Sequence, residues 1–113
     1  GLWCPEYRDS RIPKRLIEDI GGLSIACAHA DRDLRAANLA AAIILTGHTH
    51  VPRIERIGVS VYVNPGHLKS AESRDNPPSF ATITLTQNMV TVRIHGVDGG
   101  VRLEETFLRD QLA

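Results

Sequence analysis

The chain has few of the features that mark membrane or nucleic-acid-binding proteins. No apolar run approaches the roughly 20 residues that a transmembrane helix needs, and the opening residues contain no signal-peptide core. Aromatic residues make up only 4% of the chain, too few for a stacking platform for single-stranded nucleic acid. The 13 basic and 13 acidic residues balance without forming a block. We therefore expect no membrane attachment, and nucleic-acid binding is unlikely on these grounds.

Cysteine is equally scarce. Cys4 and Cys27 are the only two, and they do not form a CxxC pair, so neither a disulfide framework nor a cysteine-based zinc site is expected. Cys27 stands in an apolar run and is expected to be a small buried residue. Two isolated cysteines are typical of a reducing compartment, which predicts a cytoplasmic protein.

Enough apolar residues remain, 42% of the chain, to bury one core. No repeat or low-complexity linker divides the sequence, so we expect one unit over residues 1–113. Residues 1–14 are expected to form an irregular entry segment and residues 15–113 a sheet-rich core. The sequence lacks an initiating methionine, which suggests a fragment of a longer chain.

The stretch before residue 28 allows two interpretations. Apolar residues between 13 and 20 recur at helical spacing, and Gly21 would then cap a helix. Alternatively, residues 15–20 form a strand that turns at Gly21 and Gly22 into a second strand. Residues 23–28 alternate between larger apolar and small side chains and predict a strand in either case.

A strand–helix–strand unit is expected next. Residues 31–42 combine Asp31 or Asp33 as N-cap with strong helix formers, and residues 43–46 are a short apolar strand, parallel to residues 23–28. Each strand ends close to a histidine. Because the carboxyl ends of parallel strands meet at one edge of a sheet, where ligands bind in open α/β sheets, we expect a site there.

The second half of the sequence is expected to be rich in β-sheet. Residues 53–57 and 60–63 flank Gly58 as a hairpin, and residues 64–79 form a long loop rich in Pro, Gly, Ser and Asn. Residues 80–85 and 89–94 alternate around a turn at residues 86–88, and residues 101–107 offer one more strand. His95 is expected at the surface. A loop as long as residues 64–79 is usually functional or mobile.

The motif "GHTH", residues 47–50, carries the chemistry. A strand end followed by Gly47 gives a rigid frame and a sharp turn, so that His48 and His50 project from one tight loop. Neutral imidazoles held this way bind Zn²⁺ or Mn²⁺. With His29 at the end of the neighbouring strand, three imidazoles converge on one edge. The pattern favours a metal site over a chance grouping of exposed histidines.

"GHTHVP", followed by "VYVNPGHLKSAESRDNPPSFATITL", resembles the last third of a calcineurin-like metallophosphoesterase. The resemblance covers residues 23–94, and residues 44–66 are its specific core. It is similar to the small single-domain phosphodiesterase group, which also includes a retromer scaffold subunit. That family implies an α/β (α+β) fold, a four-layer α-β-β-α sandwich of which this chain supplies the C-terminal half. It also favours the hairpin over the helix before residue 28.

The resemblance implies roles for individual residues. His29 and His48 would bind one metal, and His50 would bind the other. Asn64, Pro65 and Gly66 would shape the loop beside the site together with Gly47, and Arg74 and Pro78 would hold the return of that loop. The cofactors would be two divalent ions (Mn, Zn, Fe or Ni) that activate a hydroxide to hydrolyse a phosphodiester or phosphomonoester.

Departures from the family pattern limit these expectations. Ala30 replaces a glycine. His67 replaces a small hydroxyl residue, and we expect it to be exposed, with a substrate contact or a variant metal neighbour as the alternatives. The family's Asp-x-His, Gly-Asp-x-x-Asp and Gly-Asn-His-Asp/Glu stretches do not occur in residues 1–113. No residue here is therefore identified as the general acid, and the chain alone is expected to be inactive.

The missing family motifs also predict which partners the chain needs. The site would need a missing N-terminal half or a complementing chain, and the exposed strand edges of a half-sheet favour such a chain or a homodimer. The alternative function is a non-catalytic protein-interaction scaffold on the same fold. The histidines count against that alternative because scaffold members tend to lose them.

Overall fold

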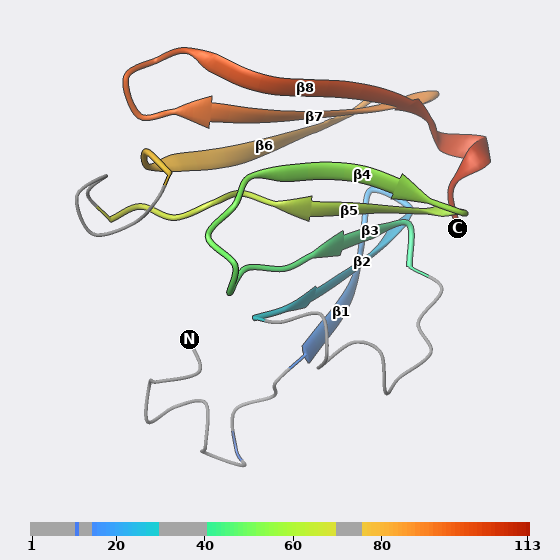
Figure 1. The fold of residues 1–113 in the computed structure, drawn as a ribbon. Helices are drawn as coiled ribbons and strands as arrows, with labels where there is room; N and C mark the ends of the chain where they lie inside the picture. The colour runs from blue at the N-terminus through green and yellow to red at the C-terminus, as the bar shows by residue number, and fades with distance from the viewer. Residues whose placement is uncertain (1–10, 12–14, 30–40, 70–75) are drawn as a thin grey trace.

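Two β-sheets stacked face to face make up the described part of the chain, residues 11, 15–29, 41–69 and 76–113 (Figure 1). The structure is a computed structural model. Three predictions fall on residues outside the described ranges. These are the expected helix over residues 31–42, except its last two residues, the entry segment, except Arg11, and the role of Arg74. No helix in the described ranges has the length and apolar character needed to cross a membrane.

The first sheet has five strands. In spatial order they are β1 (Arg15–Ile20), β2 (Leu23–Ala28), β3 (Ile43–Leu45), β5 (Ser60–Asn64) and β4 (Arg53–Ile57). The three central strands β2, β3 and β5 run parallel, and the edge strands β1 and β4 pair antiparallel with their neighbours. The expected parallel pairing of residues 43–46 with residues 23–28 is confirmed, and so is the hairpin around Gly58.

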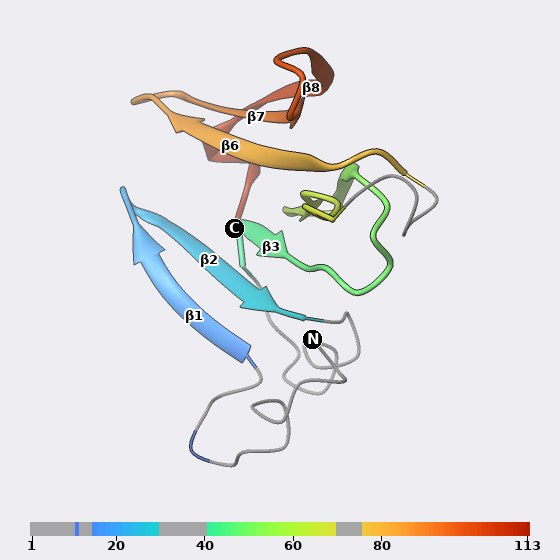
Figure 2. The same cartoon turned by 90° about the vertical axis from the view of Figure 1, so that its left-hand side faces the viewer.

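The hairpin before residue 28 is also confirmed, and the helical alternative is wrong. Ile20 pairs with Leu23 across a two-residue turn, in which Gly21 and Gly22 have φ values of 59° and 84°. Consecutive left-handed residues suit a tight hairpin, and glycine adopts them without steric penalty. The apolar residues of β1 fall at helical spacing in the sequence, yet the whole strand is exposed. β1 lies beyond β2 from the three-stranded sheet (Figure 2).

The second sheet is an antiparallel meander of three strands. These are β6 (Ser79–Leu85), β7 (Met89–Gly96) and β8 (Val101–Leu108), followed by the short 3₁₀ helix η3 (Arg109–Gln111). The turn between β6 and β7 is closed by Thr86, whose backbone N–H donates to the Met89 carbonyl at 2.9 Å. Its hydroxyl oxygen accepts from the Met89 N–H at 3.0 Å. The expected strands and the turn over residues 86–88 are thus confirmed.

The main core fills the space between the two sheets. Alternation along β7 buries Val90, Val92 and Ile94 completely, and they pack with buried side chains of the five-stranded sheet such as Ile43 and Val61. Burial of this apolar surface is the dominant favourable contribution to folding. The core fixes how the central strands of the first sheet lie, and with them the loops that follow those strands.

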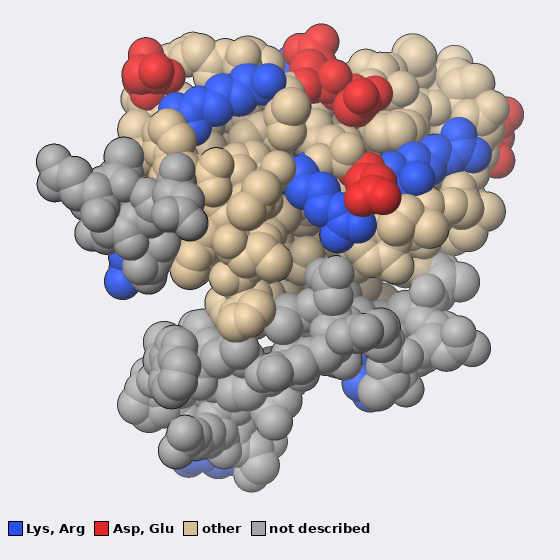
Figure 3. All heavy atoms as spheres, in the orientation of Figure 1, with Lys and Arg blue, Asp and Glu red and all other residues tan. Residues whose placement is uncertain are grey.

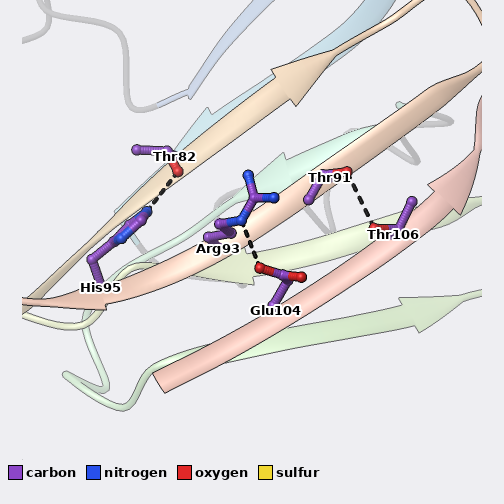
Figure 4. Close-up of polar contacts among 6 residues, drawn as sticks. All are labelled: Thr82, Thr91, Arg93, His95, Glu104 and Thr106. Carbon is purple, nitrogen blue, oxygen red and sulfur yellow. Dashed lines mark hydrogen bonds and ion pairs between the residues drawn. The ribbon is translucent and has the colours of Figure 1, made fainter. Parts of the chain in front are cut away.

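The other face of β7 is polar and looks away from the core (Figure 4). His95 lies on this face, as expected, half-buried beside Thr82 at 2.7 Å. Arg93 pairs with Glu104 at 2.6 Å across to β8. A second face, drawn in Figure 3, carries basic and acidic side chains next to one another, so neither sign dominates it.

One expectation about the core is wrong. Cys27 is exposed rather than buried. Its strand places it on the same face as Leu23 and Ile25, but the residue lines an open hollow of about 420 Å³ between the sheets, opposite Ala81 and Ile83. Partial burial against these apolar side chains raises the pKa of the Cys27 thiol, so the thiol stays protonated at neutral pH.

Candidate metal centre

The three parallel strands end at one edge of the five-stranded sheet (Figure 1). β2 leads to His29, β3 leads to residues 46–50, and β5 ends at Asn64. Two backbone hydrogen bonds continue the ladder beyond the strands: Gly47 N–H donates to the His29 carbonyl at 2.9 Å, and Thr46 N–H donates to the Val63 carbonyl at 3.0 Å. The chain therefore brings its histidine-bearing loops together at the carboxyl edge of the sheet, as the strand–helix–strand pattern predicts.

His29 and His48 lie side by side. The distance from His29 Nε2 to His48 Nδ1 is 3.3 Å, and the ring centroids are 5.2 Å apart with the planes at 73°. Two nitrogen ligands on one tetrahedral zinc, each about 2.0–2.1 Å from the metal, lie about 3.3 Å apart. The spacing of these two nitrogens therefore fits a pair of ligands that share one ion.

Two residues of the "GHTH" loop have left-handed backbone conformations, which residues other than glycine rarely adopt. His48 has φ 66° and His50 has φ 62°. Thr49 N–H donates to the Gly47 carbonyl at 2.8 Å, which makes a three-residue turn centred on His48. Each left-handed residue costs of order 1–2 kcal/mol, and such strain clusters at functional sites.

Gly47 contributes to this loop in a different way from the one expected. It is not among the glycines with positive φ, and a Cβ added to it would meet the His29 carbonyl at an ordinary 3.6 Å. The sharp turn is instead made by His48 and His50. Gly47 offers its N–H to His29 and its carbonyl to the turn.

Asn64 joins the "GHTH" loop to the loop after β5. The side chain is only 3% exposed. Its Nδ2 donates to the Gly47 carbonyl at 3.1 Å and to Thr49 Oγ1 at 3.0 Å, and its Oδ1 accepts from Gly66 N–H at 2.9 Å. The sequence predicts a role for Asn64 but none for Thr49, because nothing in the pattern distinguishes a threonine between two histidines from a residue that only separates them.

Pro65 and Gly66 make the turn that follows. Gly66 has φ 88°, and a Cβ built on it would lie 2.2 Å from Ser79 Oγ. Ser79, which is buried, donates its hydroxyl to the Pro65 carbonyl at 2.7 Å. Ser79 was not singled out from the sequence, where it is the first residue of an ordinary strand. It ties the start of β6 to this turn.

His67 is buried, at 8% exposed, and the expectation of an exposed side chain is wrong. Its Nδ1 accepts from Lys69 N–H at 3.1 Å, and its Nε2 contacts the carbonyl of Asn76. These hydrogen bonds to backbone groups satisfy both ring nitrogens in the buried position. His67 also lies edge-on to His50, with ring centroids 5.8 Å apart and planes at 80°.

The described residues thus hold the four histidines as two pairs. His29 is paired with His48, and His50 is paired with His67. Within the part of the chain that the structure describes, no group of three or more His, Cys, Asp or Glu is arranged to hold a metal ion. In the described part, the spacing of His29 and His48 thus fits a shared ion, while His50 is not grouped with them and lies beside His67.

Several solved structures share this fold. Vacuolar Protein Sorting 29 from Cryptosporidium parvum superposes with a TM-score of 0.71 at 26% identity, over 89% of this chain and 62% of that one. A protein from Streptococcus pneumoniae TIGR4, described as a predicted phosphoesterase, gives 0.70 at 25% identity, over 89% and 65%. Vps29 from Entamoeba histolytica, solved in complex with Zn²⁺, gives 0.62 at 25% identity, over 85% and 61%.

This chain spans less than two thirds of the length of these structures. Its α/β fold, with one mixed and one antiparallel sheet, is that of these proteins. The model of the calcineurin-like phosphoesterase superfamily domain matches residues 5–88, most of the chain, including both histidine-bearing loops. The chain therefore belongs to the calcineurin-like phosphoesterase superfamily.

Proposed function

We propose that this chain supplies the histidine half of a two-metal centre in a phosphoesterase that hydrolyses phosphodiesters or phosphomonoesters. The observation that carries the proposal is the 3.3 Å spacing of His29 Nε2 and His48 Nδ1 at the carboxyl edge of the sheet. Family membership supplies the reaction class. The metals, whether Mn, Zn, Fe or Ni, would act as Lewis acids on the phosphate oxygens and lower the pKa of water to near 7.

The donor set suits such ions. Imidazole nitrogens are good ligands for Zn²⁺, Fe²⁺ and Ni²⁺, and each nitrogen must be neutral to bind. His48 and His50 both have left-handed backbone conformations within one tight loop. Asn64 supports both by holding the carbonyl of Gly47 and the hydroxyl of Thr49.

Residues 1–113 do not contain the family's Asp-x-His, Gly-Asp-x-x-Asp and Gly-Asn-His-Asp/Glu stretches, which would supply the carboxylates of a two-metal centre. Two ions held about 3.5–4 Å apart need bridging negative charge, which imidazoles do not provide. We propose that the acidic ligands and the general acid come from a segment outside this sequence or from a complementing chain. The chain alone is then expected to bind metal weakly and to turn over little or no substrate.

Hydrolysis by the full-length gene product that contains these residues tests the function. With bis(p-nitrophenyl) phosphate and Mn²⁺, we expect turnover that falls at least about tenfold, 1.4 kcal/mol in transition-state stabilisation, in the variant His48→Ala. The matched control is His95→Ala, which removes a histidine from the outer face of the other sheet and should leave turnover unchanged. Equal loss in both variants, or none in either, would show that the edge site is not the catalytic one.

A protein-interaction scaffold is the second candidate. The edge strand β1 favours it, because Leu16, Ile17 and Ile20 are about half exposed there and no strand among the described residues pairs with its outer side. The same assay separates the two candidates. A full-length product that binds metal and hydrolyses neither phosphodiesters nor phosphomonoesters would favour the scaffold, and His48-dependent turnover would exclude it as the sole function.

A further inference from the structure

We propose that His67 is a positioning residue that orients the ring of His50 and closes the loop beyond it. The proposal deepens the function above and rests on it for the role of His50 as a metal ligand. His67 is the most buried of the four histidines at this edge, and its ring is the aromatic neighbour of His50 at 5.8 Å. No ion or substrate contact of its own is required for this role.

The hydrogen bonds of His67 determine which nitrogen carries its proton. Nδ1 receives the backbone N–H of Lys69, so Nδ1 must present a lone pair. Nε2 faces the carbonyl oxygen of Asn76, which only accepts, so Nε2 must carry the hydrogen. The neutral Nε2–H tautomer satisfies both partners. The alternative tautomer would place N–H against N–H at one nitrogen and a lone pair against a carbonyl at the other.

With these two hydrogen bonds, the His67 ring joins two residues that flank the loop, Lys69 and Asn76; we call this arrangement the clasp. Lys69 lies two residues after it and Asn76 nine residues after it, so one ring joins both ends of the intervening segment. Ser79, at the start of β6, adds a further hydrogen bond across the ends of the loop, because its backbone N–H donates to the His67 carbonyl at 2.8 Å. Both ring nitrogens are thus engaged by backbone groups. His67 therefore has no nitrogen left for a phosphate, which argues against the substrate-contact alternative.

The contact with His50 explains why an aromatic side chain serves here. The planes of the two rings lie at 80°, an edge-to-face arrangement that aromatic pairs prefer. His50 has a left-handed backbone, with φ 62°. His67, from its buried position against the His50 ring, limits how that ring can turn.

The tautomer can be tested without any substitution. Long-range ¹H–¹⁵N spectra of the metal-free protein should show His67 as the Nε2–H tautomer near neutral pH. A His67 found as the Nδ1–H tautomer would overturn the clasp. This readout does not depend on metal binding, so it stands or falls separately from the proposed function.

Two variants separate the clasp from the ring contact. His67→Asn keeps an acceptor close to the Nδ1 position but removes the ring and its bond to the Asn76 carbonyl, so the Lys69 amide should keep its protection from exchange while the His50 ring signals shift. His67→Phe keeps a ring but removes both hydrogen bonds, so the Lys69 amide should lose its protection from exchange. Unchanged His50 ring signals in His67→Asn would contradict the positioning role.

A double-variant comparison then tests the link to metal binding. His67→Asn should weaken Zn²⁺ binding about 10- to 100-fold, as removing a group that orients a ligand does. In a His50→Ala background the same substitution should have no further effect, because the residue acts through His50. An equal loss in both backgrounds would overturn this link and indicate a general structural role. If the wild-type protein binds no Zn²⁺, the proposed function fails, while the metal-free spectra still decide the clasp.

Discussion

Asn64→Ala is expected to lower the free energy of unfolding by about 3 kcal/mol, because it removes three hydrogen bonds of about 1 kcal/mol each from a buried side chain. The loss leaves the Gly47 carbonyl and the Gly66 N–H without this partner. Since Asn64 is the connection between the two loops of the site, the substitution should also weaken Zn²⁺ binding by about 10- to 100-fold. Urea denaturation followed by circular dichroism measures the first effect, and calorimetric Zn²⁺ titration measures the second.

Asn88→Ala is the matched control for this substitution. It deletes the same amide from an exposed position in the turn between β6 and β7, and should change stability by less than about 0.5 kcal/mol. If Asn64→Ala proved as mild as Asn88→Ala, the hydrogen bonds of Asn64 would not hold the loops together.

Gly66→Ala is expected to lower the free energy of unfolding by about 2–3 kcal/mol. The left-handed backbone at φ 88° costs about 1–2 kcal/mol with a side chain, and the new Cβ would lie 2.2 Å from Ser79 Oγ. Ser79 would have to rotate and give up its hydrogen bond to the Pro65 carbonyl, worth about another 1 kcal/mol. The same denaturation experiment gives the change.

Gly58→Ala isolates the contribution of the clash. Gly58 has a positive φ of 61° in the turn between β4 and β5, but a Cβ there would meet nothing within 4 Å. It should therefore show only the backbone penalty of about 1–2 kcal/mol. The difference between the two variants should shrink when Ser79→Ala is added to Gly66→Ala. Equal losses for Gly66→Ala and Gly58→Ala would mean that the contact with Ser79 does not matter.

Much of the fold follows from local sequence patterns. Alternation in β6 and β7 and the short apolar run of β3 each have one dominant structural solution. The helical alternative for residues 13–20 arose because β1 is an edge strand that is exposed throughout. Apolar periodicity reports which face is buried, and a strand with no buried face gives a misleading period.

The site was only partly predictable for a different reason. The position of His29 and His48 at adjacent strand ends follows from parallel topology, so the sequence sufficed to bring them together. The burial of His67 depends on the carbonyl of Asn76, and the exposure of Cys27 depends on the open hollow that separates it from Ala81 and Ile83 of the facing sheet. Neither is encoded within a few residues of the side chain concerned. Two of the three bonds of Asn64, those to Gly47 and Thr49, likewise join segments that are distant in the sequence.

The pairing of His29 with His48 on one metal ion is the central claim, and a Zn²⁺ titration of this protein followed by NMR of its histidine rings tests it most directly. The expected result is that the ring signals of both residues move together in a single transition, while His95, on the other sheet, is unaffected at the same Zn²⁺ concentration. Independent transitions for His29 and His48, or a response no stronger than that of His95, would contradict the account.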